Sequence, residues 1–138
     1  MLNQTAEYAL RVVVHLAGLP AGESARAAAL ASELDIPANY LSKILHQLAA
    51  EGILASRRGR AGGFRLAVAA SRLRVATVVA PFDDLARSRV CVLGQVVCSD
   101  STACEAHRQW KPIAEKMKEF FERTTVATLA RPAPKRGA

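Results

Sequence analysis

Residues 37–64 read PANYLSKILHQLAAEGILASRRGRAGGF, and this stretch decides how the rest of the chain is interpreted. Pro37 suits the first turn of a helix, where its missing amide hydrogen costs no hydrogen bond. Four apolar residues then recur at the spacing of one helical face: Leu41, Ile44, Leu45 and Leu48. The other flanks carry polar residues and no carboxylate: Asn39, Tyr40, Ser42, Lys43, His46 and Gln47. The pattern predicts a helix with one buried face and one hydrogen-bonding face.

A basic hairpin is predicted directly after this helix. Gly52 can end the helix in a left-handed C-terminal turn. Residues 53–56 and 64–68 have the composition of two short strands, and the segment RRGRAGG at 57–63 places three arginines on a glycine-rich turn between them. A helix followed by a basic β-wing indicates a surface that lies against a polyanion.

Length and composition favour a single domain. The chain has 138 residues, and its apolar fraction of 51% is enough to bury a core. Its apolar runs are too short to span a bilayer, and the N-terminal segment carries Glu7 and Arg11 inside its apolar pattern, unlike an export signal. We therefore expect a soluble, cytoplasmic protein with no membrane association.

The charge distribution says more than the net charge. Nineteen Lys and Arg against twelve Asp and Glu give +7. Residues 52–82 hold no acidic residue and six arginines, at positions 57, 58, 60, 65, 72 and 74. Such a run fits a DNA- or RNA-binding face and is equally compatible with a solvated basic surface.

The residues before this stretch predict two further helices. Residues 2–18 follow a helical apolar spacing, and Ser24 is a candidate N-cap for a second helix that ends near Leu34. Residues 35–37 form the turn before the polar-faced helix. Two short helices joined by a tight turn indicate a helix-turn-helix, and the basic wing favours that interpretation over an ordinary helical hairpin.

A long helix is predicted near the C-terminus, after a short helix at 72–80 and a loop at 90–103. It starts at Cys104 or Glu105 and carries a heavy apolar stripe: Trp110, Ile113, Ala114, Met117, Phe120 and Phe121. A dimer interface would bury this stripe, and packing on the first helix is the alternative. Residues 126–130 add a helical turn, and residues 131–138 are expected to be a disordered tail.

Cysteine occurs only in one short segment. Cys91, Cys98 and Cys104 lie within fourteen residues, and His107 follows one helical turn later. An odd number of cysteines in a cytoplasmic chain favours metal or redox chemistry over a disulfide framework. Three thiolates and an imidazole suit an iron–sulfur cluster or zinc. The alternatives are a thiol switch that forms a disulfide and, for His107, an ordinary surface histidine.

The chain as a whole resembles a known family. It is similar to the IscR/NsrR/RirA group of bacterial transcription regulators, the Rrf2 family. The resemblance is carried, in chain order, by EYALRVVVHLA, IPANYLSKILHQLAAEGILASRRGRAGGFRLA, the cysteine segment, HRQWKPI and TTVATL. The resemblance covers residues 2 to about 130 and implies a winged helix-turn-helix homodimer whose long helix crosses to the partner subunit. It also implies an iron–sulfur cluster that senses cluster supply, nitric oxide, iron or redox state.

The resemblance assigns roles to individual residues. The cluster ligands would be Cys91, Cys98, Cys104 and His107, with 2Fe–2S preferred and 4Fe–4S possible. Recognition-helix and wing residues would contact a double-stranded, palindromic operator: Asn39, Tyr40, Ser42, Lys43, Arg57, Arg58, Arg60 and Gly62.

The predicted fold is mainly α with a small β-wing, a winged helix-turn-helix with a long C-terminal dimerisation helix. Its parts would be the DNA-binding domain at 1–82, the connector and cysteine loop at 83–107, the dimerisation helix and terminal turn at 105–130, and the tail at 131–138. The predicted function is a cluster-controlled transcription regulator and not an enzyme, since no substrate-positioning loop accompanies the cysteines. The alternative is a metal-free regulator that switches by disulfide formation.

Overall fold

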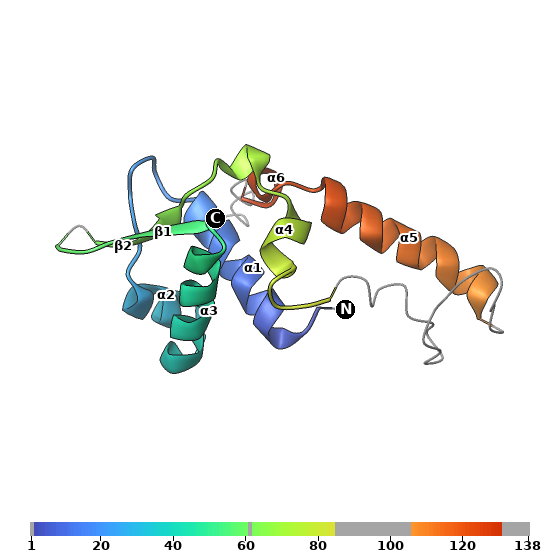
Figure 1. The fold of residues 1–138 in the computed structure, drawn as a ribbon, viewed down its shortest axis with the longest axis horizontal. Coiled ribbons are helices and arrows are strands. Elements are labelled where there is room, and N and C mark those ends of the chain that lie inside the picture. The colour runs from blue at the N-terminus through green and yellow to red at the C-terminus, as the bar shows by residue number, and fades with distance from the viewer. Residues whose placement is uncertain (1, 61, 85–105, 131–138) are drawn as a thin grey trace, which may run out of the picture.

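The computed structural model describes residues 2–60, 62–84 and 106–130. These residues form a helical head with a two-stranded wing and one long helix that leaves the head (Figure 1). The head contains α1 (Gln4–Ala17), α2 (Ala27–Leu34), α3 (Ala38–Ala50), β1 (Leu54–Arg57), β2 (Gly63–Leu66), the 3-10 turn η1 (Ala70–Arg72), α4 (Val75–Val79) and α6 (Val126–Leu129). The long helix is α5 (His107–Arg123). The predicted mainly helical class with a β-wing is confirmed.

Parts of the prediction fall outside the described residues, including the loop at 90–103 and the start of the long helix at Cys104 or Glu105. Cys91, Cys98 and Cys104 belong to residues 85–105, and the predicted tail is residues 131–138. The proposed division of the chain into four functional parts stays a prediction. No helix in the described part of the chain has the length and apolar composition that a membrane span requires.

The apolar stripe of α3 forms the centre of the core. Leu41, Ile44, Leu45 and Leu48 are all buried, at 0 to 2% exposure, as their spacing predicted. They pack with buried residues of α1 and α2, including Val12, Val13 and Leu30. Gly52 has φ 75° just after α3, so the predicted left-handed stop is also confirmed. The polar flank of α3 is therefore left on the outside.

The start of α2 differs from the prediction. Ser24 is not its N-cap, because the chain stays extended through Arg26, which occupies the N-cap position without a side-chain capping bond. The cause is a long-range pairing: the Ala25 amide donates to the Phe64 carbonyl at 2.9 Å, and the Phe64 amide donates to the Ala25 carbonyl at 2.7 Å. The segment before α2 thus pairs with the wing as an isolated antiparallel bridge.

The wing is a short antiparallel hairpin. β1 and β2 pair from Leu54 with Leu66 to Arg57 with Gly63, one residue later for the first strand than expected. The second strand starts one residue earlier than expected because Gly63 takes part in the pairing. The hairpin projects from the head at the end opposite α5 (Figure 1).

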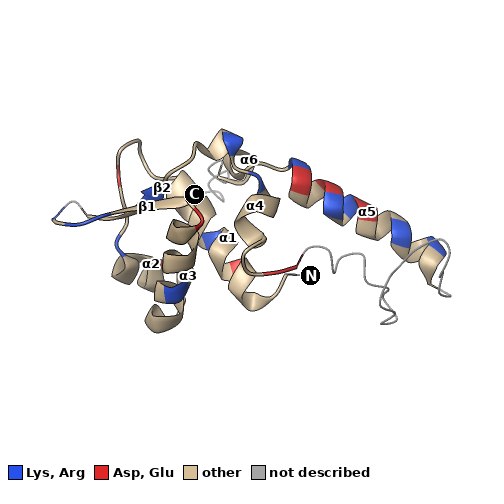
Figure 2. Cartoon of the chain, viewed as in Figure 1, with Lys and Arg blue, Asp and Glu red and all other residues tan. Residues whose placement is uncertain are grey.

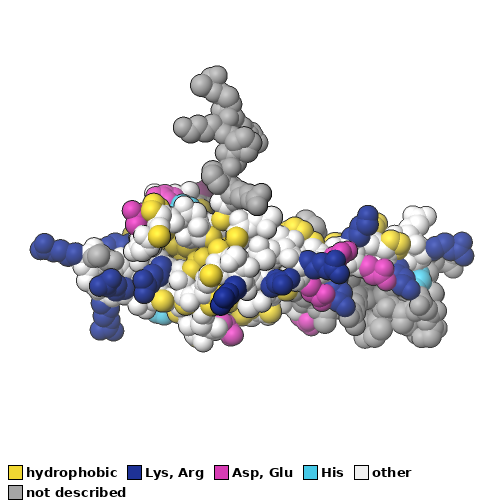
Figure 3. Space-filling model, turned by 90° about the horizontal axis from the view of Figure 1, so that it is seen from above, with side chains coloured by type: hydrophobic (Ala, Val, Ile, Leu, Met, Phe, Trp, Pro, Cys, Tyr) yellow, Lys and Arg dark blue, Asp and Glu magenta, His cyan; other side chains and the backbone are white. Residues whose placement is uncertain are grey.

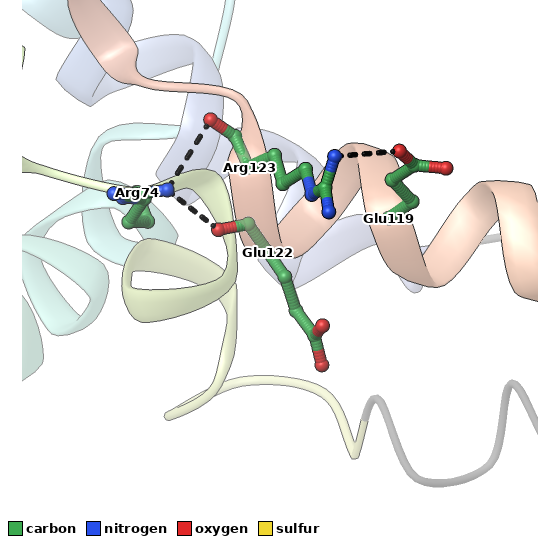
Figure 4. Close-up of polar contacts among 4 residues, drawn as sticks. All are labelled: Arg74, Glu119, Glu122 and Arg123. Carbon is green, nitrogen blue, oxygen red and sulfur yellow. Dashed lines mark hydrogen bonds and ion pairs between the residues drawn. The ribbon is translucent and has the colours of Figure 1, made fainter.

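A second junction joins the head to α5. The helix predicted at 72–80 is divided into η1 and α4 because Arg74 is extended and pairs with Thr125. The Val75 amide donates to Thr124 at 3.0 Å, and the Val126 amide donates to Leu73 at 2.8 Å. The Arg74 side chain adds to this junction, since its Nη1 donates to the carbonyls of Glu122 at 3.1 Å and Arg123 at 3.5 Å (Figure 4).

Helix α5 is only partly covered by the other described residues of the chain. None of its residues is buried, and Ile113 and Phe120 are 50% and 46% exposed. Phe121 alone among its apolar side chains is packed against the small buried cluster of Ala6, Val75 and Val79. An open groove of about 530 Å³ lies between α1 and α5, lined by Leu2, Glu7, Leu10, Ile113, Lys116, Met117, Phe120 and Phe121. Packing on the first helix therefore leaves Ile113 and Phe120 exposed and the other residues of the stripe only partly buried.

Candidate nucleic-acid interface and cysteine segment

The outer face of α3 presents its polar side chains near the N-terminus of the helix. Asn39 and Lys43 are exposed, and Ser42 is half-buried. The Asn39 Oδ1 accepts a hydrogen bond from the Tyr40 amide at 3.0 Å, so part of its acceptor capacity serves the first turn. These residues keep an uncharged or cationic surface over the first turns of the helix, as an element placed against a polyanion requires.

Tyr40 is tied to α1 while it stays partly exposed. Its hydroxyl hydrogen-bonds with the Thr5 hydroxyl, and its ring meets the Tyr8 ring edge-on at 5.8 Å between centroids. The Arg11 guanidinium lies 5.7 Å above the Tyr8 ring and donates to the Leu34 carbonyl at 2.6 Å. Tyr40 remains 37% exposed. Side chains of α1 thereby fix the orientation of one of the predicted DNA contacts.

The wing carries the predicted arginines on its outside. Arg57 ends β1, and Arg58 and Arg60 lie in the turn; all three are exposed. Lys and Arg residues colour the hairpin in Figure 2, and long basic side chains protrude from that end of the molecule in Figure 3. The wing therefore offers concentrated positive charge on a narrow element, a form that fits a DNA groove.

Gly62 has a different place in the turn. It is buried, and its amide donates to the Gly59 carbonyl at 2.9 Å. A Cβ at this position would lie 2.4 Å from the Arg57 carbonyl oxygen, a distance that the backbone cannot accommodate. Gly62 thus shapes the wing turn, and its predicted contact with DNA stays a prediction.

Arg26 is a residue of this region that the sequence analysis did not single out. Its Nη2 donates to two carbonyl oxygens of the wing turn, those of Gly59 at 3.0 Å and Arg60 at 2.9 Å. The available signal was its position, because an arginine at a helix N-cap is unusual where Ser, Thr, Asp or Asn would be preferred. That signal became readable only once the helix start was known.

The run of six arginines does not form one continuous patch. Arg57, Arg58 and Arg60 lie on the wing, whereas Arg74 lies at the junction with α5 and donates to its last carbonyls. Since cations near a helix C-terminus favour its dipole, Arg74 has a structural role there. Arg74 therefore serves the junction with α5, and the two interpretations of the run at 52–82, a DNA- or RNA-binding face and a solvated basic surface, stay predictions.

His107 is the first residue of α5, and the residue before it occupies the N-cap position. It is half-buried and is described without the three cysteines. Within residues 2–60, 62–84 and 106–130, no three metal-binding side chains come together. The donor set itself, three thiolates and one imidazole within seventeen residues of sequence, fits iron–sulfur ligation, with His107 at the point where the cysteine segment enters a helix.

Comparison with known proteins gives one family. The family model described as Rrf2, iron-dependent transcriptional regulator, matches residues 2–132. A putative HTH-type transcriptional regulator of Aquifex aeolicus is 28% identical over 131 residues, which cover 94% of this chain and 90% of the relative. A putative HTH-type transcriptional regulator of Mycobacterium tuberculosis is 32% identical over 130 residues, covering 94% and 80%. The regulator IscR of Vibrio atlanticus is 32% identical over 94 residues, covering 68% and 54%.

Two solved structures share the fold. CymR of Bacillus subtilis, named as its global cysteine regulator, superposes with a TM-score of 0.80 at 19% identity, covering 97% of this chain and 98% of CymR. IscR of T. potens superposes with a TM-score of 0.74 at 15% identity, covering 100% and 92%. At these identities the likeness establishes the winged-helix fold alone.

Proposed function

Because the chain belongs to the Rrf2 family of transcription regulators, we propose that it is a dimeric DNA-binding regulator whose affinity for its operator depends on an iron–sulfur cluster. Like its relatives, it is a transcription regulator and not an enzyme. Regulators of this family bind DNA, typically as dimers. The observation that carries the DNA-binding proposal is the exposed wing of three arginines at the same end of the molecule as α3 (Figures 1 and 2).

In this proposal α3 and the wing divide the work. Polar side chains of α3 (Asn39, Tyr40, Ser42 and Lys43) face base edges in the major groove. Arg58 and Arg60 at the exposed turn enter the adjacent minor groove, and Arg57 contacts phosphate. Because contacts between arginine and phosphate are electrostatic, the affinity for DNA falls steeply as the salt concentration rises. Two heads related by a two-fold axis would favour a palindromic operator.

The ligands of the cluster would be Cys91, Cys98, Cys104 and His107. A bound cluster, 2Fe–2S by preference and 4Fe–4S as the other form, supplies a redox centre that responds to oxidants, nitric oxide or iron supply. His107 would join the cysteine segment to the first turn of α5. Ligation there would hold the segment against α5, and its release would change how the two heads are placed.

Dimerisation through α5 completes the proposal. None of its apolar side chains is fully buried, and two are exposed, Ile113 at 50% and Phe120 at 46%. Monomeric proteins rarely expose apolar patches of this kind, so a second subunit is the natural cover. The groove between α1 and α5 gives that subunit a place to insert apolar side chains.

Purification without oxygen tests the sensing proposal. We expect a coloured protein that contains iron and sulfide, and that changes its affinity for a duplex selected from a random pool when the cluster is removed. A colourless protein that forms an intramolecular disulfide with peroxide would establish the thiol-switch alternative, which the clustering of three cysteines also supports. An intact protein that ignores duplex DNA at low salt in every state would exclude both.

A further inference from the structure

We propose that Arg26 is a positioning residue for the wing, which holds the wing turn in the shape that DNA contact requires without contacting DNA itself. The inference rests on the proposed DNA-binding function. Its basis is the pair of hydrogen bonds that Arg26 Nη2 donates to the carbonyls of Gly59 at 3.0 Å and Arg60 at 2.9 Å.

Hydrogen bonds from outside the wing turn matter because the glycines of the turn leave its backbone with much conformational freedom. Gly59 and Gly63 have positive φ values of 104° and 141°, and glycines have the largest conformational freedom to lose. Inside the turn the Gly62 amide donates to the Gly59 carbonyl at 2.9 Å. Arg26, at the start of α2, also donates to this Gly59 carbonyl and to the carbonyl of Arg60.

The backbone at Arg26 is held by hydrogen bonds on one side and by a helix on the other. Ala25, the preceding residue, exchanges two backbone hydrogen bonds with Phe64 at 2.9 and 2.7 Å, and Arg26 is followed directly by α2. From this backbone position the guanidinium group of Arg26 reaches the wing turn and donates to its carbonyls. The turn is thereby fixed at two places, one at each end of the path from Gly59 to Phe64.

The residue type also indicates this role. An N-cap arginine forgoes the capping bond that Ser or Asp would make, and α2 has no side-chain cap. A residue that departs from the preference of its local position commonly has a function elsewhere in the structure. Here the side chain caps the wing turn: it binds carbonyl oxygens of the segment that carries Arg58 and Arg60, and so directs their side chains.

The first test uses the full-length protein without DNA. Arg26→Ala should make the Gly62 amide exchange with solvent about tenfold faster by NMR, since two charge-assisted bonds to the turn are lost. Amides of α3 report that the head stays folded, and Arg26→Gln replaces the alanine variant if it does not. Arg123→Ala, which removes an exposed arginine of α5, is the charge-matched control and should leave Gly62 unchanged. Unchanged exchange in Arg26→Ala would overturn the inference.

The second test asks how Arg26 acts on DNA binding. With a duplex selected from a random pool by the wild-type protein, Arg26→Ala should weaken binding about tenfold, or about 1.4 kcal/mol. In an Arg58→Ala/Arg60→Ala background the same change should add no further loss. A further tenfold loss there, with the salt slope reduced by about one, would show that Arg26 binds phosphate directly and overturn the inference.

The two tests separate the inference from the function on which it rests. A wild-type protein that binds no duplex overturns the proposed function, and the exchange of Gly62 still decides whether Arg26 fixes the turn. Normal DNA binding by Arg26→Ala, beside weakened binding by Arg58→Ala/Arg60→Ala, overturns the inference and leaves the proposed function intact.

Discussion

At Gly63 the wing passes the connection between α1 and α2 too closely for any side chain. Its φ is 141°, and an added Cβ would lie 2.5 Å from the Ala25 carbonyl oxygen. Two constraints therefore act on one residue, a backbone conformation that L residues rarely adopt and the closeness of a second backbone. A glycine of the segment that the sequence links to a polyanion-binding wing is thus also required by the fold.

We predict that Gly63→Ala destabilises the protein by about 2 to 4 kcal/mol, since strain and a backbone clash add. Urea unfolding followed by circular dichroism measures the change. Gly18→Ala is the matched control: Gly18 has φ −83°, and a Cβ there would lie 3.5 Å from the nearest atom, the His15 carbonyl oxygen. That variant should be neutral or slightly more stable. Equal stability of the two variants would contradict the pairing of Ala25 with Phe64.

His107 allows a prediction about the proposed cluster. His107→Ala should change the visible absorption spectrum of protein purified without oxygen and lower its iron content, because three thiolates would leave one ligand position unfilled. His15→Ala is the control, since His15 lies on α1 with its Nε2 2.9 Å from a Glu33 carboxylate oxygen. A spectrum and iron content equal to the wild type would remove His107 from the ligand set.

At the scale of elements, what could be predicted depended on whether local sequence decided it. The stripe of α3 places Leu41 and Leu48 in the core because helical periodicity is a local property. The start of α2 was missed because Ala25 pairs with a strand residue thirty-nine positions away. The helix predicted at 72–80 is interrupted for the same reason, since Arg74 pairs with Thr125. The wing arginines were found from composition, whereas Arg26 needed the three-dimensional fold.

We predict that Arg74→Ala loosens the last turn of α5 and destabilises the protein by about 0.5 to 1 kcal/mol, because the helix loses a cation that binds its terminal carbonyls. Amide exchange of Thr124, whose amide donates to Phe120 at 3.0 Å, should become faster. Arg72→Ala, an exposed arginine of η1, provides a control with the same charge change. An effect of equal size in both variants would indicate general electrostatics and exclude a specific contact.

The whole molecule separates its surfaces by chemistry. The wing and α3 lie at one end, and α5 extends from the other (Figure 1), with Ile113 and Phe120 exposed on it. Basic side chains protrude at the wing end (Figure 3). The junction at Arg74 and the packing of Phe121 against Ala6, Val75 and Val79 are described connections through which a change at α5 would reach the head (Figure 4). In the proposed function, a signal received near His107 would act on DNA binding through the placement of whole heads.

We predict that Phe120→Asp converts the proposed dimer into a monomer. The change places a carboxylate among apolar groove residues, including Ile113 and Met117, and removes an aromatic ring that a partner would bury. The dimer dissociation constant should rise at least about 100-fold, close to 3 kcal/mol, as analytical ultracentrifugation would show. Glu115→Lys, a larger charge change on the opposite side of α5, should leave the dimer intact. Because two heads on one operator require a dimer, the Phe120 variant should also lose its preference for a palindromic duplex over a single half-site. A monomeric wild-type protein, or a Phe120→Asp variant that remains dimeric, would exclude this face of α5 as the interface.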